Sequence, residues 1–250
     1  MLAATSVLMA AVLSRPADVR MAETYSSLAT HLLTKLAERN GPRAAPLWVG
    51  IAGGPGAGKS TLAAAVAERM NAAVAGSCVV LPMDGFHYTR AQLRLLDPPD
   101  AATLLPRRGA PWTFDAEALY AALREAKRTG EAHLPTYSRE LSDPVEGGAR
   151  LQRSHRCVLV EGNYLLMRHE KRWAELDALW DERWFVKCVS AEEQRRRLIA
   201  RHLETWNEEK TQRWGPGQAG AAARADANDV KNMEIIALCE GYADQVVESV

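Results

Sequence analysis

Residues 53–60 read Gly-Gly-Pro-Gly-Ala-Gly-Lys-Ser and match the phosphate-binding loop pattern G-x-x-x-x-G-K-[ST] at every fixed position. Glycines allow the backbone turns that point successive N–H groups inward, toward phosphate oxygens. Lys59 would place a cation against the β- and γ-phosphates, and Ser60 would supply a hydroxyl to Mg²⁺. The pattern therefore predicts that this loop binds a nucleoside triphosphate. The residues of the loop are Gly53, Gly54, Pro55, Gly56, Ala57, Gly58, Lys59, Ser60 and Thr61.

The segments on either side of the loop are those that such a motif needs. Residues 47–52 are apolar and predict a short buried strand that enters the loop. Residues 59–70 are rich in alanine and predict the helix that leaves it. The N-terminus of that helix would add partial positive charge where the phosphates lie. The predicted strand, loop and helix thus follow one another in the order that a phosphate-binding loop needs. A glycine-rich turn that arose by chance would not need that order.

Further apolar runs predict a sheet, because helical segments separate them. The expected strands are 47–52, 77–84, 156–162, 183–190 and 243–248, and the expected helices are 22–40, 59–70, 116–129 and 191–206. Runs that are apolar almost throughout suit strands buried on both faces of a parallel sheet. We therefore expect an α/β protein with the P-loop NTPase fold: a doubly wound, mainly parallel five-stranded sheet flanked by helices. Ligands of such sheets bind at the carboxyl ends of the strands.

Two segments do not read as buried core. We interpret residues 139–155 as a small insert on the substrate side of the sheet. Residues 213–220 are rich in glycine, and we expect a mobile loop there. We predict a single domain over residues 21–250, preceded by an extension, 1–20, of uncertain role.

That extension begins with fourteen apolar or small residues, which are too few to span a bilayer and follow no basic segment. Arg15 and Arg20 come next, so weak organelle targeting and a true start at Met21 both stay open. We otherwise expect a cytoplasmic protein. The 31 basic and 31 acidic residues cancel, so we expect neither nucleic acid nor a membrane as partner. Four widely spaced cysteines with no CxxC pair predict reduced core thiols: Cys78, Cys157, Cys188 and Cys239.

Two carboxylates follow predicted strands. Asp84 comes directly after the second strand, and Glu161 follows four apolar residues of the third. In a parallel sheet both would lie at the edge that holds the phosphate loop. A carboxylate there can accept a proton from a substrate hydroxyl or hold Mg²⁺ through water. The alternative for each is an acidic strand end or helix cap without a chemical role.

Several sequence blocks together resemble one family. The blocks are the phosphate loop, Met-Asp-Gly-Phe-His-Tyr at 83–88, Arg-Arg-Gly-Ala-Pro-Trp-Thr-Phe-Asp at 107–115, Pro-Thr-Tyr-Ser-Arg at 135–139 and Val-Glu-Gly-Asn-Tyr at 160–164. Their order and spacing over residues 45–250 resemble the phosphoribulokinase/uridine kinase family, closest to its branch of pantothenate kinases and uridine-kinase-like ATPases. The resemblance implies a lid helix within about residues 190–220, and family members often form homodimers. The second block differs from the Asp-Ser-Phe-Tyr of true uridine kinases.

The resemblance implies roles for matching positions. Asp84 would be the base or metal partner, and Glu161 the second acid; Ser60, Asp84 and Glu161 would form the metal site. Tyr137 and Arg139 match a segment that contributes to the acceptor site.

Arg197 and Arg201 match arginines that a lid supplies to phosphates, and their i, i+4 spacing puts both on one helix face. A solvated basic face is the alternative for either arginine. Asn228 and Asp229 match a C-terminal Asn-Asp motif that would line the nucleotide-base end, although a capped turn explains them nearly as well.

The remaining acceptor-site candidates come from the same blocks. His87 closely follows the predicted catalytic strand, which favours a pocket wall over a core histidine. Arg108 would anchor an anionic or polyol substrate, or pair with a neighbouring acid. Tyr88 and Asn163 complete the predicted substrate-binding set.

The resemblance implies an ATP- and Mg²⁺-dependent kinase that phosphorylates a hydroxyl of a small metabolite, such as a nucleoside, a sugar or pantothenate. The alternative is an ATP hydrolase or regulatory ATPase without a small-molecule acceptor. A GTP-driven switch is disfavoured because no Asn-Lys-x-Asp motif follows a later strand.

Overall fold

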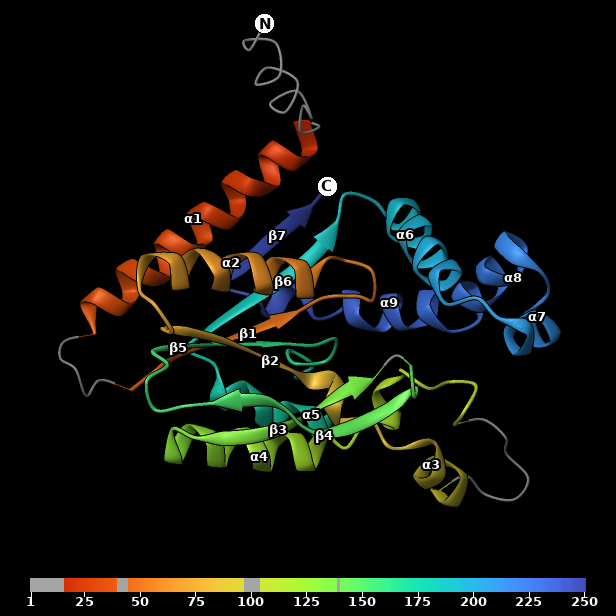
Figure 1. The fold of residues 1–250 in the computed structure, drawn as a ribbon, viewed down its shortest axis with the longest axis horizontal. Helices are drawn as coiled ribbons and strands as arrows, with labels where there is room; N and C mark the ends of the chain where they lie inside the picture. Colours follow the sequence, from red (N-terminus) through yellow and green to blue (C-terminus); the bar gives the residue numbers. More distant parts are fainter. Residues whose placement is uncertain (1–15, 40–44, 97–103, 139) are drawn as a thin grey trace, which may run out of the picture.

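The computed structural model describes residues 16–39, 45–96, 104–138 and 140–250. A five-stranded parallel sheet with strand order β2-β5-β1-β6-β7 forms its centre (Figure 1). The strands are β1 (Leu47–Ala52), β2 (Cys78–Pro82), β5 (Cys157–Glu161), β6 (Glu182–Cys188) and β7 (Gln245–Ser249). The predicted P-loop fold is thus confirmed, with every expected strand present.

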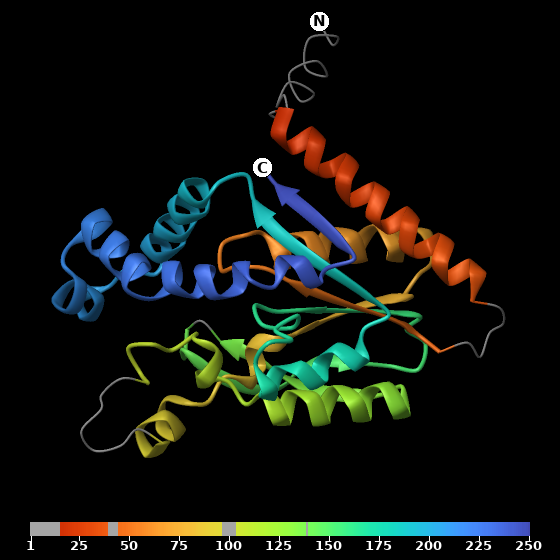
Figure 2. The ribbon, with the colours of Figure 1, turned by 180° about the vertical axis from the view of Figure 1, so that it is seen from behind.

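Helices cover both faces of the sheet, as in a doubly wound fold. Helices α1 (Pro16–Glu38) and α2 (Lys59–Ala73) pack on one face, and α4 (Ala116–Thr129) and α5 (Lys171–Ala174) lie beyond the other (Figures 1 and 2). Short segments connect these layers. They are α3 (Arg90–Leu96) and the 3₁₀ turns Met83–Phe86, Pro111–Thr113, Glu175–Leu179 and Glu240–Tyr242.

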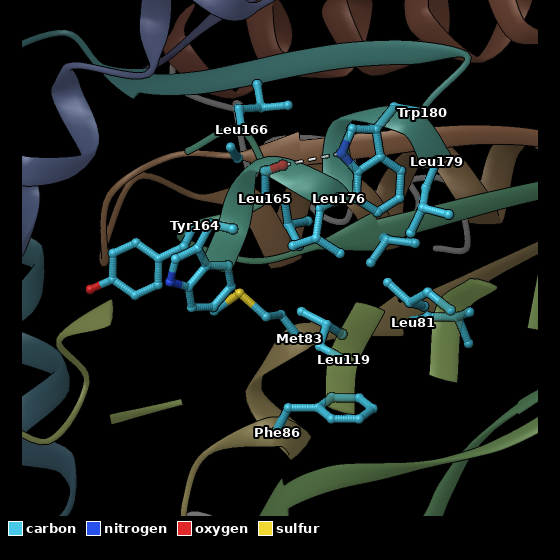
Figure 3. Close-up of a cluster of buried hydrophobic side chains, with 14 of the residues drawn as sticks. Leu81, Met83, Phe86, Leu119, Tyr164, Leu165, Leu166, Leu176, Leu179 and Trp180 are labelled. Carbon is cyan, nitrogen blue, oxygen red and sulfur yellow. Dashed lines mark hydrogen bonds between the residues drawn. The ribbon is translucent and has the colours of Figure 1, made fainter. Parts of the chain in front are cut away.

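Side chains of β1, β2, β5 and β6 alternate between two apolar cores, whereas β7 contributes Val247 to one of them. Val49 and Ile51 of β1 join the core under α1 and α2, whereas Trp48 joins the core on the opposite face. The second core is drawn in Figure 3, where the Trp180 indole nitrogen donates a 3.1 Å hydrogen bond to the Leu165 carbonyl oxygen. Trp48, Trp180 and Trp184 are buried. The uniformly apolar strand sequences follow from this two-sided burial.

The segment 139–155, expected outside the core, contributes to it. Strand β4 (Asp143–Leu151) pairs antiparallel with β3 (Ala132–Ser138) in a separate hairpin. Ala149 and Leu151 are buried within the core that also contains α4 residues. The non-core prediction was therefore wrong for this strand, because its polar residues alternate with the few apolar ones that face inward.

The segment 213–220 is helical and not a mobile loop. Helices α6 (Ala191–Glu204), α7 (Glu208–Trp214) and α8 (Gly217–Arg224) follow one another beside the carboxyl edge of the sheet (Figure 1). The chain turns between α7 and α8 at Gly215, whose φ of 93° is in the left-handed region. A Cβ on Gly220 would lie 2.1 Å from the Gly215 carbonyl oxygen. These glycines serve close helix packing, which composition alone cannot distinguish from flexibility.

A π-helical turn, Ala225–Asp229, joins α8 to α9 (Val230–Ala237). Helix α1 begins at Pro16, earlier than the expected boundary near residue 21, and β2 ends at Pro82 because residues 83–86 form a 3₁₀ turn. The four cysteines are buried and free, as predicted. No helix within the described ranges combines the length and apolar character needed to cross a membrane.

Candidate active site

Three chain segments meet at the carboxyl edge of the sheet. Strand β5 lies between β1 and β2, and its last residue, Glu161, stands opposite Ile51 on one side and Pro82 on the other. The phosphate loop continues from β1, and Asp84 lies in the 3₁₀ turn after β2. The two predicted carboxylates therefore flank one another beside the loop, as parallel pairing requires.

The phosphate loop has the backbone that its sequence predicts. Gly53, Gly56 and Gly58 all have φ between 79° and 151°, which other residues rarely adopt. A Cβ on Gly53 would lie 2.2 Å from the Val186 carbonyl oxygen of the neighbouring strand. The glycines thus serve both backbone direction and packing against β6.

Lys59 is held under the loop by two hydrogen bonds. Its ammonium donates to the Gly54 carbonyl oxygen at 3.0 Å and to Asn163 Oδ1 at 2.8 Å. Burial lowers the pKa of Lys59, and nearby Glu161 and Asp84 act in the opposite direction. A phosphate group at this position would favour the charged amine still further, because it adds negative charge in a desolvated place.

Ser60 and Glu161 form the part of the site that suits a divalent cation. Ser60 Oγ donates to Glu161 Oε2 at 3.1 Å. Asp84 is exposed, and no described residue donates a hydrogen bond to its carboxylate. Hydroxyl and carboxylate oxygens are the ligands that Mg²⁺ prefers, so these three side chains fit the ion that the sequence predicts.

His87 lies beside Asp84, and both side chains line one cavity at the carboxyl edge of the sheet. Its Nδ1 donates to the Asp84 carbonyl oxygen at 2.8 Å, which leaves Nε2 of the neutral ring as an acceptor. The ring centroid lies 3.8 Å from that of Phe114 and 4.9 Å from that of Tyr137. Burial lowers the pKa of His87. The ring is therefore an aromatic wall with one polar atom available to a ligand.

Arg108 pairs with an acid, which was one of its two sequence-based interpretations. Its Nη2 donates to Asp143 Oδ1 at 2.7 Å and to the Tyr88 carbonyl oxygen at 2.9 Å, and its Nη1 donates to the Ser142 carbonyl oxygen. The guanidinium carbon lies 5.5 Å from the Tyr137 ring centroid. Arg108 thereby fastens the hairpin to the cavity wall.

A single cavity of about 820 Å³ gathers most of the predicted site, a volume typical of small-molecule pockets. Seven basic and five acidic side chains line it. The predicted residues that line it are Pro55, Lys59, Ser60, Asp84, His87, Arg108, Tyr137, Glu161, Asn163, Arg201, Asn228 and Asp229.

Some predicted residues lie elsewhere. Arg197 donates to Glu193 Oε1 at 2.9 Å and to Ser249 Oγ at 3.0 Å, and it does not line the cavity. Tyr88 does not line the cavity either, although its carbonyl oxygen accepts a hydrogen bond from the cavity-lining Arg108. The side chain of Thr61 is exposed outside the cavity wall. Arg139 lies outside the described residues.

The structure adds residues that sequence analysis missed. His202 of α6 is 7% exposed, and its Nε2 lies 2.7 Å from Asp229 Oδ2. Arg90, Arg213 and Arg224 also line the cavity. Burial lowers the pKa of Arg224, and no described residue accepts a hydrogen bond from it. No motif signals these residues, because they reach the cavity only through the long-range packing of α3, which carries Arg90, and of α6, α7 and α8, which carry the other three.

A candidate uridine kinase of Schizosaccharomyces pombe is 34% identical to this chain over 194 residues, which cover 75% of this chain and 77% of that protein. This chain belongs to the phosphoribulokinase/uridine kinase family of P-loop kinases. As a member of the phosphoribulokinase/uridine kinase family, it is an ATP-dependent kinase of a small molecule.

Two further relatives and one family model match this chain. The solved structure of a candidate fructose transport system kinase from Silicibacter sp. TM1040 matches with a TM-score of 0.73 and 31% identity, and the match covers 89% of this chain and 98% of that one. Pantothenate kinase of Lactococcus lactis is 28% identical over 149 residues, or 59% of this chain and 46% of that enzyme. Residues 30–119 match the Zeta toxin family.

Proposed function

We propose that this protein transfers the γ-phosphoryl group of ATP to a hydroxyl of a small metabolite. The observation that carries the proposal is the exposed Asp84 carboxylate, which shares one cavity with Lys59 and with the Ser60–Glu161 pair. A kinase needs these parts together: a cradle for the phosphates, oxygen ligands for a cation and a base for the acceptor.

The phosphate loop would hold ATP. Its backbone N–H groups would face the β- and γ-phosphates, and the Lys59 ammonium would add positive charge beside them. Ser60 and Glu161, with Asp84, would hold Mg²⁺, which when bound neutralises charge on the phosphates. The residues present fit both groups, because the hydroxyl and carboxylates form one surface beside the loop.

Asp84 would act as the base. The acceptor hydroxyl oxygen forms a bond to the γ-phosphorus while the bond from that phosphorus to the β,γ-bridging oxygen breaks, so ADP leaves with the bridging oxygen. The proton of the hydroxyl passes to the Asp84 carboxylate. An acceptor bound against His87 and Tyr137 would lie next to that carboxylate, since all three side chains line the cavity.

The lid would complete the site. Arg201 lines the cavity from α6, and its charge is close enough to Lys59 to contribute to that residue's lowered pKa. A guanidinium in this position neutralises charge on the transferring phosphoryl group, and closure of the lid over the site excludes water. We assign the phosphoryl-stabilising role to Arg201 and withdraw Arg197, which Glu193 and Ser249 hold away from the cavity.

The names of the relatives support three acceptor classes. They are a nucleoside, from the candidate uridine kinase; a sugar, from the candidate fructose transport system kinase; and pantothenate, from the Lactococcus enzyme. Each has an alcohol hydroxyl, from which the Asp84 carboxylate could accept the proton.

An ADP-release assay tests this proposal. The protein is incubated with Mg²⁺ and ATP and a panel of nucleosides, hexoses, pentoses, pantothenate and glycerate, with Asp84→Asn as the matched variant. We expect one acceptor to raise turnover at least tenfold, about 1.4 kcal/mol of barrier, and Asp84→Asn to remove that gain. Equal ADP release with and without every acceptor would instead favour the ATP hydrolase alternative.

A further inference from the structure

Arg107 lies next to the cavity-lining Arg108 but does not itself line the cavity. Its side chain extends in the other direction, toward the C-terminal helices. Nη2 donates to Asn232 Oδ1 at 3.1 Å, and Nη1 donates to the Ala227 carbonyl oxygen at 3.3 Å. Asn232 is 2% exposed, so the acceptor of this partly buried hydrogen bond is shielded from solvent.

The C-terminal helices return a hydrogen bond to the same loop. Asn228 Nδ2 donates to the Arg108 carbonyl oxygen at 2.6 Å. Gly109 has a φ of 101°, and a Cβ there would lie 3.6 Å from Asn232 Nδ2, so the loop backbone lies directly against the asparagines. Side chains thus cross in both directions between loop 107–109 and the segment 227–232.

This crossing joins the two halves of the site. On one side, Arg108 binds Asp143 of β4 and so holds the hairpin. On the other side, Asp229 of the π-helical turn binds His202, which is the neighbour of Arg201 on the lid helix. Turns of this kind inside helices are frequent at functional sites. Hydrogen bonds that are joined by short stretches of backbone therefore run from the β3–β4 hairpin to α6, the helix that carries Arg201.

We propose that Arg107 is a positioning residue that couples nucleotide binding at the lid to the placement of the acceptor hairpin. A shift of the π-helical turn on nucleotide binding would move the Arg107 guanidinium and, through the adjoining backbone, Arg108 and the hairpin. The inference rests on the proposed nucleotide site but not on the identity of the acceptor. Its physical basis is the set of hydrogen bonds and short backbone segments described above. A direct measurement of coupling between the two sites tests the inference.

Hydrogen exchange monitored by mass spectrometry tests the coupling in the full chain. The probe is Mg²⁺ with the non-hydrolysable analogue AMP-PNP, so no acceptor is needed. In the unsubstituted protein we expect saturating AMP-PNP to slow exchange at least threefold both in the phosphate loop and in hairpin residues 132–151. In Arg107→Ala we expect the slowing to persist in the phosphate loop and to disappear in the hairpin, while AMP-PNP affinity changes less than threefold.

Arg124→Ala is the matched control. The Arg107 guanidinium carbon lies 5.6 Å from the Trp112 ring centroid, and that of Arg124 lies 5.5 Å from the Tyr120 ring centroid. Within the described part of the chain, however, Arg124 donates no hydrogen bond to the C-terminal helices. It should behave as the unsubstituted protein. If Arg107→Ala lowers the melting temperature by more than 10 °C, Arg107→Lys decides, and we expect it to lose at least half of the hairpin slowing. Two results would overturn the inference and leave the proposed function intact. One is full slowing of hairpin exchange in the folded Arg107 variant, and the other is no slowing in the unsubstituted protein although AMP-PNP binds. Failure of AMP-PNP to bind the unsubstituted protein would overturn the proposed function as well.

Discussion

Ser60 Oγ donates a 3.1 Å hydrogen bond to Glu161 Oε2, and this bond ties the first turn of α2 to the end of β5. It joins two residues that are 101 positions apart in the chain. Both residues line the cavity that Lys59 and Asp84 also line. A cation bound at this point would lie between the phosphate loop and the proposed base, which is where phosphoryl transfer needs it.

Glu161→Gln should weaken use of Mg²⁺ without disturbing the fold. The amide oxygen can still accept from Ser60, but the negative charge that attracts a divalent cation is lost. We expect the Mg²⁺ concentration for half-maximal ADP formation to rise at least tenfold, with the melting temperature of the nucleotide-free protein unchanged within 2 °C. Glu192→Gln, an exposed substitution on α6, should leave the Mg²⁺ titration unchanged.

Arg201→Ala and Arg197→Ala should differ sharply, although both arginines lie on one helix. Arg201 lines the cavity, whereas Arg197 is engaged by Glu193 and Ser249. We expect Arg201→Ala to lower the rate of ADP formation at least tenfold, about 1.4 kcal/mol, and Arg197→Ala to lower it less than threefold. Equal losses in the two variants would contradict the assignment of the phosphoryl-stabilising role to Arg201.

The sequence predicted the location of the acids well and that of the arginines less well. Asp84 and Glu161 follow apolar strands, and parallel pairing alone brings such strand ends to one edge. The direction of Arg197 depends on Ser249 of β7, which is 52 residues away, and no local pattern specifies that contact. Arg108 likewise meets Asp143 only because the β3–β4 hairpin folds back over the loop.

The dependence on contacts between distant residues also explains why residues 213–220 were wrongly interpreted as a mobile loop. Glycine content indicates backbone freedom, but position 220 needs glycine because a Cβ there would lie 2.1 Å from the Gly215 carbonyl oxygen and 2.7 Å from the Trp206 ring. Glycine occurs both where a helix contact needs a small residue and where a loop needs a flexible one, so the sequence alone does not distinguish the two cases. Tertiary packing decides between them.

Asp143→Asn should loosen the acceptor side of the cavity. Asp143 Oδ1 accepts from both the Arg90 backbone N–H and Arg108 Nη2. Removing its charge leaves the mostly buried Arg108 without an ionic partner, which we expect to cost about 1 kcal/mol of unfolding free energy and a few degrees in melting temperature. Thermal unfolding measures this, with Glu146→Gln on the same strand as a control that should have no effect. A stability equal to that of the control would show that the pair contributes nothing.

Glu182 should make stability depend on pH in the acid range. Burial opposes its ionisation, but hydrogen bonds from Lys35, Trp184 and His31 outweigh burial and lower its pKa below the usual 4.5. Because the folded pKa lies below the unfolded one, the unfolded chain binds more protons between the two values. The stabilisation is therefore complete above pH 4.5 and is lost as the pH falls through the folded pKa.

Glu182→Gln should accordingly lower the unfolding free energy at pH 7 by about 2 kcal/mol, because it removes the buried carboxylate that pairs with Lys35 and lies against His31. It should also flatten the acid limb of the stability profile. Denaturant unfolding between pH 7 and pH 3 measures both effects. Glu234→Gln, an exposed substitution on α9, should keep the original profile. If the unfolding free energy of Glu182→Gln fell with pH as steeply as that of the unsubstituted protein, this would contradict a lowered pKa of Glu182.

The most direct test of the central claim is to follow the fate of the γ-phosphoryl group by ³¹P NMR, with Mg²⁺, ATP and the acceptor that gives the fastest ADP release. We expect a phosphoester resonance that grows in step with ADP, little inorganic phosphate, and the loss of both products in Asp84→Asn. Inorganic phosphate that accumulates at the same rate with and without the acceptor would contradict phosphoryl transfer to a hydroxyl and make the protein an ATP hydrolase.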